Sequence, residues 1–313
     1  MSKQFLKEIF SNMYSCEALS LQLLQVKTSS RTGTAYISRE IEIKPDTKLT
    51  DYVKHLSETY SKENGIIDSF SSVDKYTGDV VNHVVYRIAA NDLIIRDELF
   101  SLKKTVADPS REALLMDIKP TALLLQCTVK NSHREIGDTS VMLISMQNPL
   151  TMLSNKFLFF TERSFHEISA PVLTLKNTVD VAIIGDTVYL FSLSGEKLFA
   201  MERSYKALEK IKADEIAKCG FLSDPDTFKA EAAKGRNPRR FVSFNQSHYE
   251  ALRTPQIRNK IAEKFSIPIK NDMIMTDKPE SVENLIKFLC DKAMLDPCDE
   301  SPMEVASSKP WGK

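Results

Sequence analysis

The sequence contains few cysteines, and their number is odd. The five lie far apart, at Cys16, Cys127, Cys219, Cys290 and Cys298, and no CxxC pair occurs. This pattern excludes a disulfide framework and argues against a cysteine-based zinc site. The opening segment MSKQFLKEIF is charged and amphipathic and lacks the apolar core of a signal peptide. We therefore expect free thiols in a reducing cytoplasm.

Long hydrophobic runs are also missing. The longest apolar stretches, such as ALLLQC (122–127) and VAIIG (181–185), fall far short of the roughly 20 residues that a membrane-spanning helix needs. We expect no direct membrane insertion, so any work at a membrane requires a separate membrane protein.

Recognisable catalytic and metal-binding motifs are absent as well. The sequence has no P-loop, GxGxxG or GxSxG, and none of its five histidines stands at ligand spacing from another His or Cys. The tripeptide Glu42-Ile43-Lys44 matches part of a nuclease motif, but no well-placed Asp precedes it. We expect no metal, no cofactor and no enzyme activity, and a metal-dependent nuclease remains the alternative.

What is present predicts an α+β protein. Apolar residues make up 42% of the 313-residue chain and charged residues 27%, which is typical of a globular protein with a substantial core. Residues 1–150 mix both patterns and predict an N-terminal sheet-and-helix lobe. Its elements are a β-hairpin over 17–46, a helix after Thr50, strands near 68–74 and 80–89, a helix over 91–104, and strands over 121–129 and 140–146.

The second lobe, over residues 151–295, should begin with strands and continue with helices. An antiparallel β-meander is expected at about 157–200, with turns at Gly185–Asp186 and Ser194–Gly195. Helices follow from residue 201, one of them capped by Asp224 and opened by Pro225. FVSFN (241–245) reads as a short strand. Residues 296–313, with three prolines, are expected to form a flexible tail.

The charge distribution is the main functional clue. The chain has 42 Lys and Arg against 42 Asp and Glu, yet residues 229–264 carry a net charge of +6. The segment holds three acids and nine cations. The cations are Lys229, Lys234, Arg236, Arg239, Arg240, Arg253, Arg258, Lys260 and Lys264.

Three interpretations of this cluster are open: a phosphate-binding surface, a dock for an acidic protein, and an ordinary solvated surface. Arginine outnumbers lysine, and its planar fork suits phosphate. Phe241, Phe244 and Tyr249 alternate with the cations and are candidates for stacking on bases. Because no recognition-helix, zinc-finger or RRM pattern occurs, we expect contact with the nucleic-acid backbone and little sequence readout. KTSSRTGT (27–34) is a weaker second candidate for phosphate contact.

Three long segments carry a resemblance to a known family. They are DVAIIGDTVYLFSLSGEKLFAMERSY (180–205), PRRFVSF (238–244) and VENLIKFLCDKAML (282–295). In their order and character, and over essentially its full length, the chain resembles the KwaB family, the second component of the Kiwa anti-phage defence system of bacteria. The match includes no sharp catalytic motif.

The resemblance implies a DNA-binding effector. Such proteins are expected to form dimers and to work with a separate multi-spanning membrane protein, KwaA. This places them in the cytoplasm, peripherally at the inner face of the inner membrane. There they bind phage double-stranded DNA and block its replication and transcription. The family supplies no residue assignments, so the nine candidate DNA-binding residues rest on charge clustering alone. A structural adaptor that docks its cations on an acidic surface of KwaA remains a further alternative.

Overall fold

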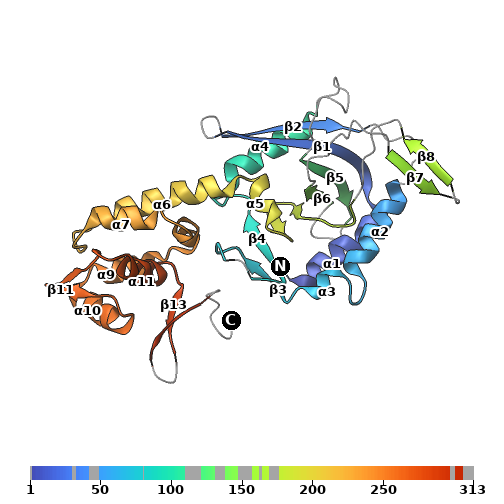
Figure 1. Ribbon diagram of the computed structural model, residues 1–313. Helices are drawn as coiled ribbons and strands as arrows, with labels where there is room; N and C mark the ends of the chain where they lie inside the picture. Colours follow the sequence, from blue (N-terminus) through green and yellow to red (C-terminus); the bar gives the residue numbers. More distant parts are fainter. Residues whose placement is uncertain are drawn as a thin grey trace. The chain divides into compact units, whose positions relative to one another are not determined.

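The computed structural model describes residues 2–29, 33–41, 49–79, 81–109, 121–130, 138–146, 157–161, 164–168, 176–296 and 300–305. The chain forms two compact units (Figure 1). Met1–Lys75 and His83–Ala200 make up the first, which we call the sheet unit. Tyr76–Asn82 and Met201–Lys313 make up the second, the helical unit. A short excursion from the first half of the chain therefore belongs to the second unit.

The sheet unit is built on an eight-stranded sheet in the order β2-β1-β5-β6-β9-β10-β4-β3. Its strands are β1 (Glu17–Ser29), β2 (Gly33–Glu40), β3 (Ser72–Lys75), β4 (Val84–Ala89), β5 (Ala122–Val129), β6 (Thr139–Met146), β9 (Val181–Ile184) and β10 (Thr187–Leu190). All neighbours pair antiparallel except β3 and β4, which are parallel. The chain between those two strands contains the excursion into the helical unit. The unit also contains a separate antiparallel pair, β7 (Phe157–Thr161) and β8 (Ser164–Ile168).

Helices cover both faces of this sheet. On one face lie α1 (Lys3–Asn12), a 3-10 turn (Met13–Ser15), α2 (Leu49–Ser61) and α3 (Ile66–Ser69). Phe10 of α1 stacks on Tyr60 of α2, and both are buried against the sheet. The other face meets α4 (Arg96–Ala107) and α5 (Ser194–Leu198). There Gln22 donates a hydrogen bond to the Val106 carbonyl, and the Tyr36 hydroxyl donates one to the Leu198 carbonyl.

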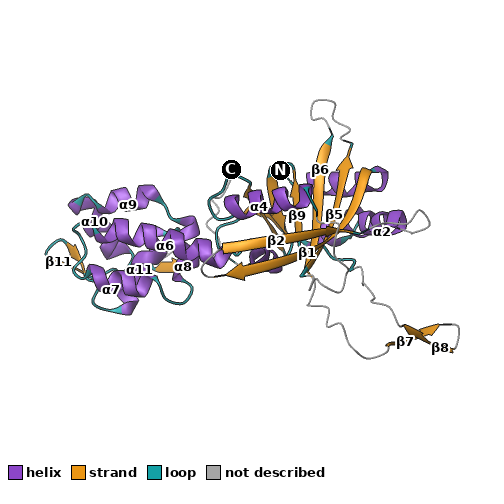
Figure 2. Cartoon of the chain, turned by 90° about the horizontal axis from the view of Figure 1, so that it is seen from above, coloured by secondary structure: helices purple, strands orange, loops and turns teal. Residues whose placement is uncertain are grey.

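The helical unit consists mainly of short helices. Its elements are α6 (Met201–Ala217), α7 (Pro225–Ala232), α8 (Asn237–Arg240), a 3-10 turn (Phe241–Ser243), α9 (Gln246–Leu252), α10 (Pro255–Lys264), α11 (Pro279–Leu289), and the ribbons β11 (Ile269–Lys270) with β12 (Met273–Ile274) and β13 (Ala293–Leu295) with β14 (Pro302–Glu304). Within the unit, α9 and α10 lie on one side and α7 on the other, with α6 and α11 between them (Figure 2). Phe228, Phe241, Leu252 and Leu285 form part of its buried core.

The α+β class is confirmed, but the division of the chain differs from the expected boundary near residue 150. The β9–β10 hairpin turns at Gly185–Asp186 as expected. It does not open a second lobe, because β9 pairs with β6 and β10 pairs with β4 in the large sheet. The boundary therefore follows Ala200. Residues 147–156 around the expected boundary, residues 169–175 of the expected meander and the tripeptide Glu42-Ile43-Lys44 lie outside the described residues.

Two local expectations were wrong. The last strand of the expected meander would be EKLFA (196–200), but its first residues lie in α5, and Leu198 and Phe199 are both buried, which a strand with one buried face does not permit. FVSFN is not a strand either: Phe241–Ser243 form a 3-10 turn, and Phe241 stacks on Phe244. Within the expected flexible tail, Pro302–Glu304 pair with Ala293–Leu295, while residues 297–299 and 306–313 lie outside the described residues.

Candidate nucleic-acid interface

The nine candidate cations all belong to the helical unit, but they differ in exposure. Three have side chains enclosed by protein: Arg239, Arg240 and Arg258. The other six are at least partly exposed: Lys229, Lys234, Arg236, Arg253, Lys260 and Lys264.

Arg258 is a core residue. It is only 6% exposed, and its Nη1 donates a hydrogen bond to the Leu252 carbonyl at 2.9 Å. Its guanidinium lies 5.4 Å from the centre of the Phe221 ring. A cation held in this way joins α9 to α10 and stacks on an aromatic face. We therefore remove Arg258 from the set of candidate phosphate contacts.

Arg239 is also committed to the interior of the unit. Its Nη2 donates a hydrogen bond to the Tyr76 hydroxyl at 3.0 Å, and its guanidinium lies 5.8 Å from the centre of the Tyr205 ring. Tyr76 belongs to the excursion from the first half of the chain. The side chain of Arg239 thus holds that excursion against α6.

Arg240 is neutralised by two carboxylates. Its Nη1 lies 3.3 Å from Glu283 and its Nη2 lies 2.8 Å from Glu304, and only 16% of its side chain is exposed. Lys287 pairs with the same two acids, at 3.1 Å and 3.0 Å. In the structure described here, Arg240 already has an anionic partner on each side.

Four of the six exposed cations form surface ion pairs. Lys234 pairs with Glu231 at 2.5 Å, Arg253 with Glu250 at 3.1 Å and Lys264 with Glu300 at 3.3 Å. Lys229 lies 3.4 Å from Asp226. Exposed pairs of this kind contribute only about 0–1 kcal/mol, so a phosphate can replace the carboxylate at little cost.

The remaining two exposed cations are Arg236 and Lys260. Among the residues that the structure describes, neither pairs with a carboxylate. Arg236 precedes α8, and Lys260 lies one helical turn before Lys264 on α10. Both residues are exposed.

The six exposed cations do not form one surface. Lys229, Lys234 and Arg236 lie on α7 and the turn that follows it, which we call the α7 group. Arg253, Lys260 and Lys264 lie on α10 and just before it, which we call the α10 group. Because α7 and α10 are on different sides of the helical unit (Figure 2), the continuous cluster in the sequence becomes two separate groups in the fold.

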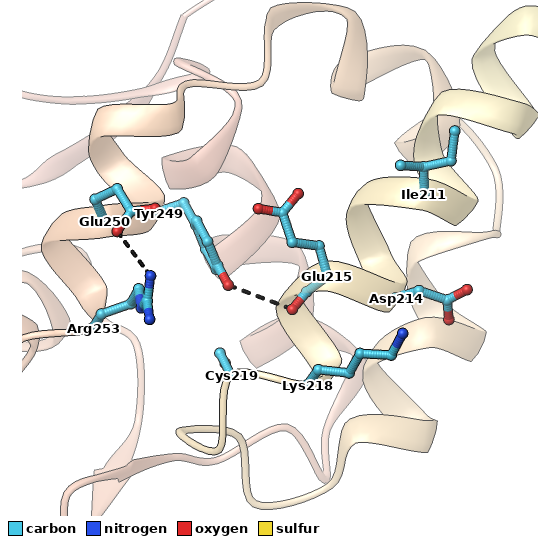
Figure 3. A pocket seen from close by; sticks show the side chains of 8 residues that line it. All are labelled: Ile211, Asp214, Glu215, Lys218, Cys219, Tyr249, Glu250 and Arg253. Atoms are coloured by element: carbon cyan, nitrogen blue, oxygen red, sulfur yellow. Dashed lines mark hydrogen bonds and ion pairs between the residues drawn. The ribbon is translucent and has the colours of Figure 1, made fainter.

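A pocket of about 470 Å³ adjoins the α10 group, between the C-terminal half of α6 and α9 (Figure 3). It is lined by Ile211, Asp214, Glu215, Lys218, Cys219, Tyr249, Glu250 and Arg253. Lys218 and Arg253 come from the ends of the two helices and lie on either side of Cys219. Burial raises the pKa of the Cys219 thiol, which keeps it protonated at neutral pH. The lining carries three acids and two cations, so the pocket is a groove of mixed charge.

Lys218 is the exposed cation that the sequence reasoning missed. It lies outside the 229–264 window, in a stretch where acids and cations alternate. One sequence signal could have indicated it. Lys218 directly follows α6, and a cation is favoured at a helix C-terminus.

The expected base-stacking aromatics are mostly enclosed. Phe241 is fully buried and Tyr249 is 5% exposed. The Tyr249 hydroxyl faces the pocket and donates a hydrogen bond to the Glu215 carbonyl at 3.4 Å. Phe244 is half-buried, with Lys212 Nζ lying 4.7 Å from the centre of its ring. The expectation that bases stack on Phe241 and Tyr249 is therefore wrong, because neither ring is accessible.

Within the described residues, no group of three or more His, Cys, Asp or Glu side chains is placed to hold a metal ion. Nor does any described helix have the length and apolar character needed to cross a membrane. Arg31 of the KTSSRTGT segment lies outside the described residues.

Comparison with known proteins gives one match. The family model described as "Kiwa protein KwaB-like" matches residues 136–295, about half of the chain. The matched range begins before β6 and ends with β13, so it includes all nine candidate cations. Neither the curated proteins nor the solved structures contain a match to this chain.

Proposed function

The chain belongs to the KwaB-like family of Kiwa proteins, which indicates a role in anti-phage defence, and we propose that it performs this role by binding double-stranded DNA without reading its sequence. The bound protein blocks replication and transcription of the phage DNA. It acts as a dimer beside the membrane protein KwaA, at the inner face of the inner membrane. Binding requires no catalytic step.

The observation that carries this proposal is the state of the exposed cations. In a chain with no net charge, Arg236 and Lys260 are accessible and pair with no carboxylate among the described residues. Four others are held only in surface ion pairs. A phosphate backbone can engage such side chains by releasing counterions, and this needs no recognition helix.

The α10 group is the stronger of the two candidate surfaces. Lys260 and Lys264 are spaced by one helical turn on the exposed side of α10, and Arg253 precedes them at the rim of the pocket. Lys218 extends the same rim from α6. Four cations, from the ends of α6 and α9 and from α10, can follow a run of phosphates, whereas the α7 group offers three cations on one helix and its turn.

The test is a salt series of binding to a random-sequence duplex, with and without Mg²⁺. For roughly 4–6 neutralised phosphates we expect log K to fall with log salt at a slope of about −4 to −5. Arg253→Gln, Lys260→Gln and Lys264→Gln together should flatten this slope by about 2–3, since each phosphate contact contributes about 0.9.

The matched control combines Lys229→Gln, Lys234→Gln and Arg236→Gln, which removes the same charge from the α7 group. A larger effect of this control would move the interface to α7. Failure of the wild-type protein to bind duplex at low salt would refute the proposed function. If the same protein lost KwaA binding on substitution of these cations, it would be an adaptor. Loss of intact duplex only with Mg²⁺ would identify a nuclease.

A further inference from the structure

Four charged side chains close a ring between α8, α11 and β14. Arg240 contacts Glu283 at 3.3 Å and Glu304 at 2.8 Å, while Lys287 contacts the same acids at 3.1 Å and 3.0 Å. Each cation therefore lies between two carboxylates, and each carboxylate between two cations. The two cations are mostly enclosed, with 16% and 20% of their side chains exposed, whereas half of the Glu304 side chain is exposed.

Glu304 occupies this ring as a bound anion does. Arg240 contacts its Oε1 and Lys287 contacts its Oε2, so cations from two different helices converge on a single carboxylate. Partial burial alone would raise the pKa of Glu304, but the hydrogen bond and charge of Lys287, together with Arg240, hold that pKa below its usual range. Glu304 is therefore ionised throughout the neutral range.

The same C-terminal ribbon covers a third cation. Glu300, four residues before Glu304, pairs with Lys264 at the end of α10 at 3.3 Å. Two acids of one short segment thus neutralise cations from three helices. Two of these cations, Arg240 and Lys264, belong to the segment that the sequence marks as cationic.

We propose that Arg240 and Lys287 form a phosphate site, and that β14 fills this site with Glu304 until a DNA phosphate displaces it. Glu300 covers Lys264 in the same way. The inference rests on the proposed function, and it adds both a contact point and a restraint on binding: the C-terminal ribbon competes with DNA for three cations.

The charge of the ring suits one phosphodiester. When Glu304 leaves, Arg240 and Lys287 remain beside Glu283, and the three side chains together carry a single positive charge. One phosphate group restores neutrality. Arginine can bind a phosphate through two parallel hydrogen bonds, and lysine adds a point charge.

The β13–β14 ribbon is only weakly held by its own pairing and packing. Each of its strands has three residues, and a two-stranded ribbon is marginal by itself. Its apolar side chains add little, because Met294 and Met303 face each other across the ribbon and remain 47% and 38% exposed. Ion pairs therefore contribute much of what holds β14 in place, and a competing anion can replace them.

The experiment compares two double variants that make the same charge change. Glu300→Gln with Glu304→Gln removes the two covering acids. Asp277→Asn with Glu280→Gln removes two exposed acids of the same unit that cover none of these cations. Circular dichroism and a thermal melt establish that both variants are folded before duplex binding is measured across a salt series.

We expect the Glu300/Glu304 variant to bind duplex about tenfold more tightly than the control at moderate salt, because DNA no longer has to displace the two acids. Lys287 separates a phosphate contact from a structural ion pair. Adding Lys287→Gln to the Glu300/Glu304 variant should reduce the magnitude of the salt slope by about 1. A purely structural role of Lys287 would leave the slope unchanged.

A second measurement uses the wild-type protein. Hydrogen exchange of the Val305 amide, which donates to the Lys292 carbonyl, should accelerate when saturating duplex is added, because β14 leaves β13. Unchanged or slower exchange, together with equal duplex affinities of the two double variants, would overturn the inference. If the wild type still bound duplex steeply, the proposed function would survive that result. If no variant and no wild-type protein bound duplex at low salt, both would fall together.

Discussion

Arg239 and Tyr76 are 163 residues apart in the sequence, and the Arg239 guanidinium donates a hydrogen bond to the Tyr76 hydroxyl at 3.0 Å. The same hydroxyl is hydrogen-bonded to Tyr205 of α6, whose ring also faces the guanidinium. Nearby, Asp79 forms an ion pair with the enclosed Lys292. These contacts make Tyr76–Asn82 part of the helical unit. A residue that the sequence marked as a DNA contact is thus a structural anchor.

Substitution of this anchor should destabilise the helical unit. Arg239→Ala should lower the free energy of unfolding by about 2–3 kcal/mol, because it removes a hydrogen bond from a charged donor and leaves enclosed tyrosine hydroxyls with fewer partners. Urea unfolding followed by circular dichroism measures the change. The matched control is Arg236→Ala, which truncates an exposed arginine three residues earlier and should stay within about 0.5 kcal/mol. Equal losses would contradict the anchor role.

Gly78 provides a second test of the same segment. Its φ is +81°, and a Cβ there would lie less than 3.0 Å from the Arg239 carbonyl oxygen. Gly220 has φ +80° and no atom within 4 Å of its Cβ position. Gly220→Ala should cost about 1 kcal/mol from backbone strain alone. Gly78→Ala should cost a further 1–3 kcal/mol or so from the clash. Equal thermal stability of the two variants would show that the segment around Gly78 accommodates the added methyl group without any further loss of stability.

The sequence predicted local structure well where the signal was local. Asp224 caps α7 as expected, its carboxylate accepting the Thr227 N–H at 2.9 Å, and Pro225 opens the helix. The hairpin of β1 and β2 and the pairing of β5 with β6 follow from neighbouring segments. Helix starts after residue 245 carry weaker local signals: the Asn245 side chain accepts the Ser247 and His248 N–H groups before α9, and Thr254 makes no side-chain cap bond before α10.

The sequence could not predict which cations are enclosed. Arg240 is neutralised by Glu304 and Arg258 stacks on Phe221, and both partners lie far away in the chain. Residue type is no guide to burial on α10 either. Ile257 is 45% exposed, while Arg258 beside it is buried. Clustering in sequence measures local charge, and the fold decides how much of that charge reaches solvent.

Glu209 offers a prediction about pH. It is 6% exposed on α6, and burial raises its pKa, with the charge of Asp214 adding to the effect. The folded protein therefore holds this proton to higher pH than the unfolded chain does. Stability should fall as pH rises from the pKa of the unfolded chain through that of the folded protein, at a cost of about 1.4 kcal/mol for every pH unit between the two values. Glu209→Gln should remove this decline and raise the melting temperature at pH 7.

The control for Glu209 is Glu202→Gln on the same helix. Its side chain is 81% exposed and pairs with Lys206, so its loss should change stability by less than about 0.5 kcal/mol at any pH. Melting curves recorded between about pH 4 and pH 8 give the comparison. This range starts near the ordinary pKa of a carboxyl group, about 4. A Glu209→Gln variant that is less stable than wild type at pH 7 would show that the carboxylate makes a necessary contact.

Cys16 should be the most reactive thiol among the described cysteines. A hydrogen bond with Cys127 lowers the pKa of Cys16 to about 7, and the same interaction raises the pKa of Cys127. Burial raises the pKa of Cys219 and of Cys290. Because the thiolate is the nucleophile, iodoacetamide at neutral pH should alkylate Cys16 first. Mass spectrometry of peptides taken at short times identifies the modified site.

The Cys127→Ala variant separates the hydrogen bond from simple exposure. Without its partner, Cys16 should return toward an ordinary thiol pKa of about 8.5, and its alkylation at pH 7 should slow by about tenfold. The rate plotted against pH should move its midpoint upward by more than about one pH unit. Cys219→Ala, which removes a thiol of the helical unit, should leave that midpoint unchanged. If both variants label Cys16 at the wild-type rate, its reactivity comes from accessibility, and the pair with Cys127 has no part in it.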